Sequence, residues 1–383
     1  MKHVKRLATL TVLLTAIAVG FVLSSNLSRA NLPPGPAVTL WEKQIPQTDL
    51  GRIYETVPTP GVPEVIATTL DRVVKASATS DYETLLQLGP DQRTTLARGG
   101  EHAGILTHRL HDVIAFEVSD LNGKMINRVE TPLHFHYRLA PKGNSFVGVD
   151  AGGEHTPPKA ERYIYRFYGP LGKVIGEVQS PRPQPNDSAY SSDGASFLIS
   201  NANGLSAYNP MDASLRWKIG KPVRFFAAAD ASSDLVVVSD GWQRQIVELY
   251  RSGTKQWDFA LPGNVRNLGI SSNGEFVLAS DAKSLHLFRS AGPKPVWSFT
   301  VPNPELSINS VAVNNQGIVV LGAQQSGLKG GMVLILDPAG AQLFQKEMVY
   351  SLSNAWIPGV QFDATGKLCL IRTVETLTLV SVQ

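Results

Sequence analysis

Cysteine is nearly absent from this chain of 383 residues, since Cys369 is the only one. A single cysteine excludes an intrachain disulfide, so the fold must be held by its core even in an oxidising compartment. Cys369 lies in the apolar run 368–371, and a free cysteine in such a run usually behaves as a small buried hydrophobe. The sequence therefore predicts a structural role for Cys369.

The chain also lacks a real excess of charge over most of its length. The whole chain has 35 basic and 32 acidic residues, but residues 1–30 hold four of the basic residues and no acidic one. Residues 31–383 therefore hold 31 basic and 32 acidic residues, a net charge of −1. Such a balance gives no electrostatic reason to expect nucleic acid or an anionic lipid surface as a partner.

No long apolar run follows the first 30 residues. Residues 1–30 begin with Lys2, Lys5 and Arg6, continue with the apolar run 7–23 and end in the small pair Ser28 and Ala30. This order predicts an export signal peptide over 1–30, with an uncleaved N-terminal membrane anchor as the alternative. The basic residues favour a cytoplasmic N-terminus. The rest of the chain is then expected outside the inner membrane, in the periplasm or the extracellular space.

Hairpin patterns recur along the chain. Residues 190–200, 270–280, 313–323 and 362–372 each combine polar residues, a glycine and a following apolar run, as in YSSDGASFLIS. The glycine supplies the positive φ of a tight turn, and its polar neighbours bond to the turn backbone. Each copy therefore predicts a strand, a turn and a second strand.

A third and a fourth strand are expected after each hairpin. The third alternates apolar and polar residues, and the fourth contains an aromatic residue: Trp217, Trp257 and Trp297 fall 40 residues apart, with Phe344 at the next equivalent place. Four short strands in every 40 to 50 residues predict an all-β propeller in which the tryptophans pack between blades. Complete repeats are expected at 82–132, 133–182, 184–223, 224–265, 266–307 and 308–357.

The last repeat ends at its third strand, 376–382, whereas residues 38–46 (VTLWEKQIP) look like an isolated fourth strand with Trp41 in the aromatic position. An open ring would leave unpaired edges, so residues 38–46 are expected to close the last blade. This gives seven blades over 82–383, with residues 31–81 a linker that includes the closing strand. Residues 47–81 have both helical spacing and strand-like composition, and an eighth blade is the alternative.

Glycine followed three to five residues later by tryptophan, as in GTKQW and GPKPVW, resembles pyrroloquinoline-quinone-like and WD40-like propeller repeats, including those of non-catalytic outer-membrane assembly propellers. The resemblance covers most of 82–383 and implies the fold alone. Many quinone enzymes of that family have a vicinal cysteine pair, and the assembly lipoproteins have a lipobox cysteine. This chain has neither.

Six of the eight histidines lie between residues 102 and 155, and the segment Gly-Gly-Glu-His occurs twice there, at 99–102 and 152–155. If both segments are loops that join the second to the third strand, they lie at the same face of the channel as the connections between successive blades. His134 falls in one of those connections. Imidazole and carboxylate groups suit a divalent metal or proton transfer. The candidate metal ligands are Glu101, His102, His134, His136, Glu154 and His155. A purely structural role for these residues is the competing interpretation, because no compact metal motif is present.

Two functions remain open. The first is an exported, non-enzymatic propeller that serves as a binding or scaffold module for a protein or another envelope component, through its rim and the loops 154–160 and 323–331. The second is a periplasmic enzyme that depends on a metal or a quinone, with its site at the channel rim. A divalent metal is the first candidate cofactor, and pyrroloquinoline quinone is the second. The sequence favours the binding role.

Overall fold

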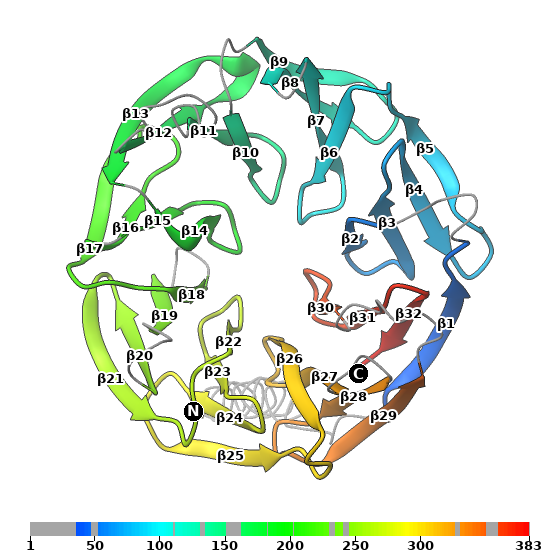
Figure 1. Cartoon of the computed structure of the whole chain (residues 1–383), viewed down its shortest axis with the longest axis vertical. Coiled ribbons are helices and arrows are strands. Elements are labelled where there is room, and N and C mark those ends of the chain that lie inside the picture. The colour runs from blue at the N-terminus through cyan, green and yellow to red at the C-terminus, as the bar shows by residue number, and fades with distance from the viewer. Residues whose placement is uncertain are drawn as a thin grey trace, which may run out of the picture. The chain divides into compact units, whose positions relative to one another are not determined.

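Short strands separated by glycine- and Asx-containing turns pair into eight four-stranded antiparallel sheets, called blades 1 to 8 below. The computed structural model describes residues 36–46, 53–109, 112–130, 135–150, 162–181, 183–201, 203–229, 234–239, 245–325, 330–349 and 359–382. Within residues 37–382 the blades stand around a common centre (Figure 1). The predicted all-β propeller is thus confirmed. In the described part of the chain, no helix has the length and hydropathy needed to cross a membrane.

Each blade is an antiparallel meander from an inner first strand to an outer fourth strand. Blades 1 to 4 consist of β2 (Glu55–Pro58), β3 (Glu64–Thr68), β4 (Arg72–Ser77) and β5 (Glu83–Gln87); β6 (Gln92–Leu96), β7 (His102–Arg109), β8 (Asp112–Asp120) and β9 (Met125–Glu130); β10 (Phe135–Leu139), β11 (Phe146–Asp150), β12 (Arg162–Tyr168) and β13 (Val174–Pro181), with the 3-10 helix η1 (Pro170–Gly172); and β14 (Pro183–Tyr190), β15 (Phe197–Asn201), β16 (Gly204–Tyr208) and β17 (Leu215–Ile219).

Blades 5 to 7 continue in the same way, and blade 8 takes its fourth strand from the start of the chain. They consist of β18 (Phe225–Ala228), β19 (Leu235–Ser239), β20 (Ile246–Arg251) and β21 (Thr254–Ala260); β22 (Asn267–Ile270), β23 (Phe276–Ser280), β24 (Ser284–Arg289) and β25 (Pro295–Thr300); β26 (Leu306–Val313), β27 (Val319–Gln325), β28 (Gly330–Leu336) and β29 (Gln342–Val349); and β30 (Gly359–Phe362), β31 (Leu368–Arg372), β32 (Thr376–Ser381) and β1 (Val38–Gln44).

The closing strand is confirmed. β1 pairs antiparallel with β32, from Val38 opposite Ser381 to Gln44 opposite Thr376, and Figure 1 shows the blue β1 beside the red β32. The Trp41 side chain is only 7% exposed and packs in the core between blades 8 and 1. Pairing of β1 with β32 removes an open sheet edge that would otherwise be available to another chain.

The predicted count of seven blades is wrong, and the alternative of eight is confirmed. Residues 55–77, placed in a linker by the sequence analysis, form β2, β3 and β4 of blade 1. Val65 packs toward blade 8, whereas Ile66 packs toward blade 2. Because neighbouring blades cover both faces of this sheet, the strands have no period-two alternation, and their apolar pattern resembled that of a helix.

The hydrophobic core is divided among the interfaces between blades. Eight clusters of buried side chains are found among the described residues, and each joins two neighbouring blades. Cys369 is fully buried in the cluster between blades 7 and 8, where burial raises the pKa of its thiol. The predicted structural role of Cys369 is confirmed.

The fourth-strand tryptophans of blades 4, 5, 6 and 8 each anchor their blade to the next one, as predicted. Each indole N–H donates a hydrogen bond to a turn of the following blade: Trp41 to the Pro63 carbonyl (2.8 Å), Trp217 to Asp234 Oδ1 (2.7 Å), Trp257 to the Ser290 carbonyl (2.8 Å) and Trp297 to the Pro338 carbonyl (3.2 Å). Burial of the ring supplies the apolar contact, and the N–H supplies direction.

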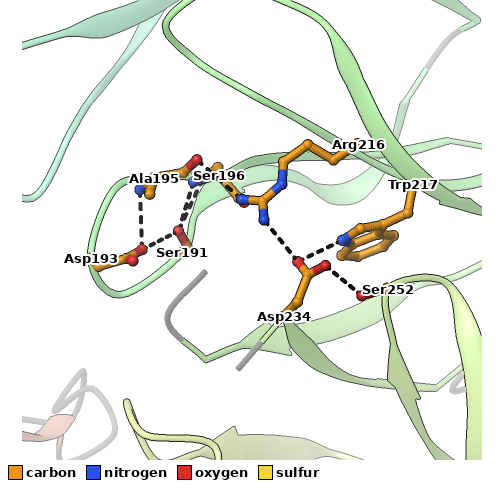
Figure 2. A network of polar contacts seen from close by, with 8 residues as sticks. All are labelled: Ser191, Asp193, Ala195, Ser196, Arg216, Trp217, Asp234 and Ser252. Atoms are coloured by element: carbon orange, nitrogen blue, oxygen red, sulfur yellow. Dashed lines mark hydrogen bonds and ion pairs between the residues drawn. The ribbon is translucent and has the colours of Figure 1, made fainter. Parts of the chain in front are cut away.

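Figure 2 shows one of these junctions, between blades 4 and 5. Asp234 Oδ1 accepts from Trp217 and lies 3.6 Å from Arg216 Nη2, while Ser252 Oγ donates to Asp234 Oδ2 at 2.6 Å. Arg216 also donates to Ser196 Oγ in the first turn of its own blade. One carboxylate therefore connects the outer strand of blade 4 with two turns of blade 5.

Candidate binding pocket in the channel

The turns that join first and second strands are linked from blade to blade. The Gly61 N–H donates to Asp363 Oδ2 at 2.9 Å, which joins blades 1 and 8. The Gly99 N–H donates to the Pro141 carbonyl at 2.8 Å, which joins blades 2 and 3. Asn314 Nδ2 donates to the Gly366 carbonyl at 2.7 Å, which joins blades 7 and 8. These bonds hold the turns at one edge of the ring in fixed relative positions.

Two of the predicted metal ligands lie at this edge. Glu101 is exposed in the turn before β7, and His102 is the first residue of β7. The His102 ring lies against Gly143 of blade 3, because a Cβ placed on Gly143 would be 2.5 Å from His102 Cγ. His102 Nδ1 is buried, and no described residue forms a hydrogen bond with it. His102 thus packs between blades.

The side chains of the other four predicted ligands lie outside the described part of the structure. His136 lies on β10, where its backbone pairs with Val149, and its side chain lies outside the described part; His134, Glu154 and His155 also lie outside the described residues. The described residues contain no group of three or more His, Cys, Asp or Glu side chains placed to hold a metal ion. The metal site stays a prediction.

The expected equivalence of the two Gly-Gly-Glu-His segments is wrong. Residues 97–101 join the first and second strands of blade 2, whereas residues 151–161 lie between the second and third strands of blade 3. Successive turns of an antiparallel meander lie at alternate edges of its sheet. The predicted repeat 82–132 was shifted by one strand, because residues 83–87 are the fourth strand of blade 1 and not the first strand of blade 2.

A pocket of about 340 Å³ lies where the inner parts of blades 8, 1 and 2 meet. Its charged lining residues are Glu55 on β2, Arg98 in the turn after β6 and Arg372 at the end of β31. Tyr54 and Val57 contribute part of the apolar wall. We refer to it below as the channel pocket.

Glu55 is a fixed part of the pocket wall. Its Oε2 accepts from the Leu96 N–H at 2.7 Å, and its Oε1 accepts from Thr95 Oγ1 at 3.3 Å, so the carboxylate joins blade 1 to blade 2. Burial raises the pKa of Glu55 above its ordinary value, while these two bonds and the positive charges of Arg138 and Arg372 oppose that rise.

The two arginines of the pocket differ in their bonding. Arg372 Nη1 donates to the Tyr54 carbonyl at 2.9 Å, across the junction of blades 8 and 1. No described residue accepts a hydrogen bond from Arg98 or forms an ion pair with it. Arg98 is exposed to solvent, while partial desolvation of its guanidinium lowers the pKa of that group. An arginine remains protonated at neutral pH in such a setting.

Sequence reasoning missed all three charged residues of the channel pocket. Glu55 falls in the predicted linker, and Arg372 is 318 positions away from its partner Tyr54. The one local signal is the position of Arg98 directly before the Gly99-Gly100 turn, where the backbone is held close to its neighbours. Only the closed ring places the three residues together.

A second surface lies on the outer side of blades 2, 3 and 4. Six exposed apolar side chains, called the outer strip below, occur at the start of each fourth strand and in the turns before those strands: Met125, Ile126, Leu171, Val174, Met211 and Leu215. The turns touch the preceding blade, because Asn127 Nδ2 donates to the Gly169 carbonyl at 3.3 Å and a Cβ on Gly176 would lie 2.7 Å from Ala213. The three outer strands β9, β13 and β17 follow one another in Figure 1.

Comparison with solved structures places the chain among WD40-like and BamB-like β-propellers in fold. The C-terminal WD40 domain of Sif2 is 11% identical, with a TM-score of 0.62, over 91% of this chain and 99% of that one. BamB from Moraxella catarrhalis is 13% identical, with a TM-score of 0.56, over 90% and 99%. Sqt1 from Saccharomyces cerevisiae is 10% identical, with a TM-score of 0.58, over 92% and 100%.

No protein-family model and no curated protein matches the chain. The structural likenesses at these identities concern the fold alone. The predicted resemblance to propeller repeats is confirmed at that level.

Proposed function

We propose that this propeller is a binding module whose partner is a protein that docks on the outer strip. The observation that carries the proposal is the exposure of large apolar side chains on three consecutive blades. Leu171 is 86% exposed, and Met125, Met211 and Leu215 are each more than half exposed. Exposed apolar residues that gather over neighbouring elements mark interaction sites more often than scattered ones do.

Leu171 adds a second reason. It has a φ of +63°, a backbone conformation that residues other than glycine adopt at a cost of roughly 1–3 kcal/mol. This backbone conformation leaves the apolar side chain of Leu171 exposed in the turn between β12 and β13. Apolar contact with a partner at this tip would offset the exposure of Leu171, which the propeller by itself leaves in water.

Photo-crosslinking tests the proposal. A photoreactive residue at Met211 should give one discrete covalent adduct in the native host, and the same residue at Ala291, in the matching turn of blade 6, should not. Leu171→Glu together with Leu215→Glu should abolish the Met211 adduct while leaving the thermal transition of the propeller unchanged. An equal adduct from Ala291, or an adduct that survives both substitutions, would contradict docking on the outer strip.

We also propose that the chain is exported and meets its partner in the cell envelope. The support is the order of charge, apolar run and small residues in 1–30, which lie outside the described residues. Fusion of residues 1–46 to alkaline phosphatase should give activity outside the cytoplasm. Replacing Lys2, Lys5 and Arg6 with glutamate should abolish it, and the mass of the mature chain distinguishes cleavage after Ala30 from a retained anchor.

A further inference from the structure

Arg98 has a positive charge that no described residue pairs with. Its guanidinium has five N–H donors, and no described residue accepts from them or pairs with the charge. Arg98 is exposed to solvent where it lines the channel pocket, so its donors are accessible to a ligand that enters the pocket. An anion that binds there exchanges water for charge-assisted bonds to the guanidinium, which are short and directional.

The backbone that carries Arg98 is fixed from three sides. The Ala97 N–H donates to the His102 carbonyl at 3.0 Å, and the Gly99 N–H donates to Pro141 in blade 3. Gly100, at a φ of +71°, lies against Val57 of blade 1. Little backbone ordering would therefore be required on binding, and preorganisation of this kind favours affinity.

The charges around the channel pocket favour an anionic ligand. Arg98 and Arg372 line the pocket, and Arg138 is close enough for its charge to act on Glu55. A carboxylate brings one negative charge. A phosphate dianion would place two negative charges near Glu55, which is held in the wall by Leu96 and Thr95.

The rest of the lining suits an apolar group next to the carboxylate. The Tyr54 side chain is 51% exposed, and Val57 and Val360 also line the channel pocket. A volume of about 340 Å³ is at the small end of ligand pockets, enough for a single side chain and the carboxylate beside it.

We propose that the channel pocket binds a monocarboxylate with a short apolar tail, which pairs with Arg98 and rests against Tyr54, Val57 and Val360. The carboxylate could be that of a small free acid or the C-terminal carboxylate of a polypeptide. The inference does not depend on the proposed protein partner, because the channel pocket lies between blades 8, 1 and 2 whereas the outer strip lies on blades 2 to 4.

Isothermal titration of the full chain tests the proposal with four probes: 4-methylpentanoate, the tripeptide Ala-Ala-Leu with a free C-terminus, the same tripeptide amidated, and inorganic phosphate, all at one ionic strength. We expect at least one of the two free carboxylates to bind and the amidated peptide not to bind. Tighter binding of the free tripeptide would identify a polypeptide C-terminus as the source, and tighter binding of 4-methylpentanoate would identify a small acid.

Arg98→Gln should weaken carboxylate binding by about tenfold or more, because it removes a charged hydrogen bond. Arg98→Lys keeps the charge without the fork geometry and should weaken binding less. Arg93→Gln is the matched control: Arg93 is exposed on β6 and donates only to nearby backbone carbonyls in the described structure, so its loss should leave the affinity unchanged. Thermal transitions of the variants separate lost binding from lost folding.

The proposal is overturned if neither free carboxylate binds, if the amidated peptide or phosphate binds as tightly as they do, or if folded Arg98→Gln retains the full affinity. Docking on the outer strip is measured by crosslinking at Met211, so either proposal can fail while the other stands.

Discussion

His102 and Gly143 form a contact between blades 2 and 3 that depends on the absence of a Cβ. Gly143 has a φ of +69°, and an added Cβ would be 2.5 Å from the imidazole Cγ. This contact accounts for the position of one residue that the sequence suggests as a metal ligand. The ring is held by packing against the next blade.

Gly143→Ala should lower the free energy of unfolding by about 2 kcal/mol or more, because it adds backbone strain and a clash with His102. Combining it with His102→Gly, which also removes the His102 Cβ that would lie 2.6 Å from the added Cβ, should recover part of that loss, and denaturant titration of the four proteins measures the coupling. Gly123→Ala is the control for strain alone, since Gly123 has a φ of +81° and a nearest neighbour at 3.5 Å. Simple additivity of the two changes would contradict the contact.

Glu55 makes stability depend on pH in a direction that the sequence does not suggest. Its folded-state pKa is raised above its ordinary value of 4.5, so the folded protein takes up a proton at a higher pH than the unfolded chain does. The corresponding stabilisation is complete below pH 4.5 and is lost as the pH rises through the folded-state pKa.

Relative to Glu55→Gln, the wild-type protein should therefore gain stability as the pH falls from 7 toward 4.5. Denaturant titrations of both proteins at several pH values measure the difference. A pH-independent difference, or one that grows as the pH rises, would show that burial does not dominate the pKa of Glu55.

At the scale of the element, β1 shows what a strand contributes when it comes from the other end of the chain. Its central residue Trp41 is buried between blades 8 and 1, whereas its neighbour Leu40 is 41% exposed. Glu42 on β1 also forms an ion pair with Lys346 of blade 7, and Lys43 forms one with Asp81 of blade 1. β1 therefore contacts the blades on both sides of its own.

Trp41→Ala should lower the free energy of unfolding by roughly 3–5 kcal/mol, through lost burial and the cavity that remains. Leu40→Ala, one position away on the exposed side, should change it by less than about 1 kcal/mol. Equal effects of the two substitutions in denaturant titrations would mean that β1 is not seated in the core.

The strands were predicted from sequence more reliably than the grouping of the strands. Turns such as 271–275 are encoded locally: Ser271 Oγ donates to Asn273 Oδ1 at 2.7 Å and accepts from the Phe276 N–H at 3.0 Å. Which four strands share a blade depends on pairing over longer distances. The turn at 89–91 looks like a hairpin turn in the sequence, although it connects blades 1 and 2.

At the scale of the whole molecule, the ring is closed because strands from the two ends of residues 37–382 pair in one blade. Without β1, the strand β32 would become an open edge, and edges of this kind accept strands from other chains. The interfaces of blade 8 with blades 7 and 1 would also lose contacts, because both associated clusters include residues from 37–45.

A chain lacking residues 1–46 should therefore associate through β32 as its concentration rises, which size-exclusion chromatography detects. A synthetic peptide of residues 37–46 should bind it, suppress the association and raise its thermal transition. The same peptide with Trp41→Ser is the control. It should bind weakly and have little effect on the association or on the thermal transition. A truncated chain that stays monomeric and ignores the peptide would contradict closure by β1.

The sequence by itself determined the strands after residue 82, their turns, the tryptophan anchors and the closing strand, because each depends on residues close together or on a repeated position. The tertiary structure decided the number of blades, the edge at which each turn lies and the channel pocket. Because both faces of a blade are buried, residues 55–77 show no clear apolar–polar alternation, and the number of blades could not be read from them. The channel pocket needs Glu55, Arg98 and Arg372 from three different blades, and only the closed ring brings them together.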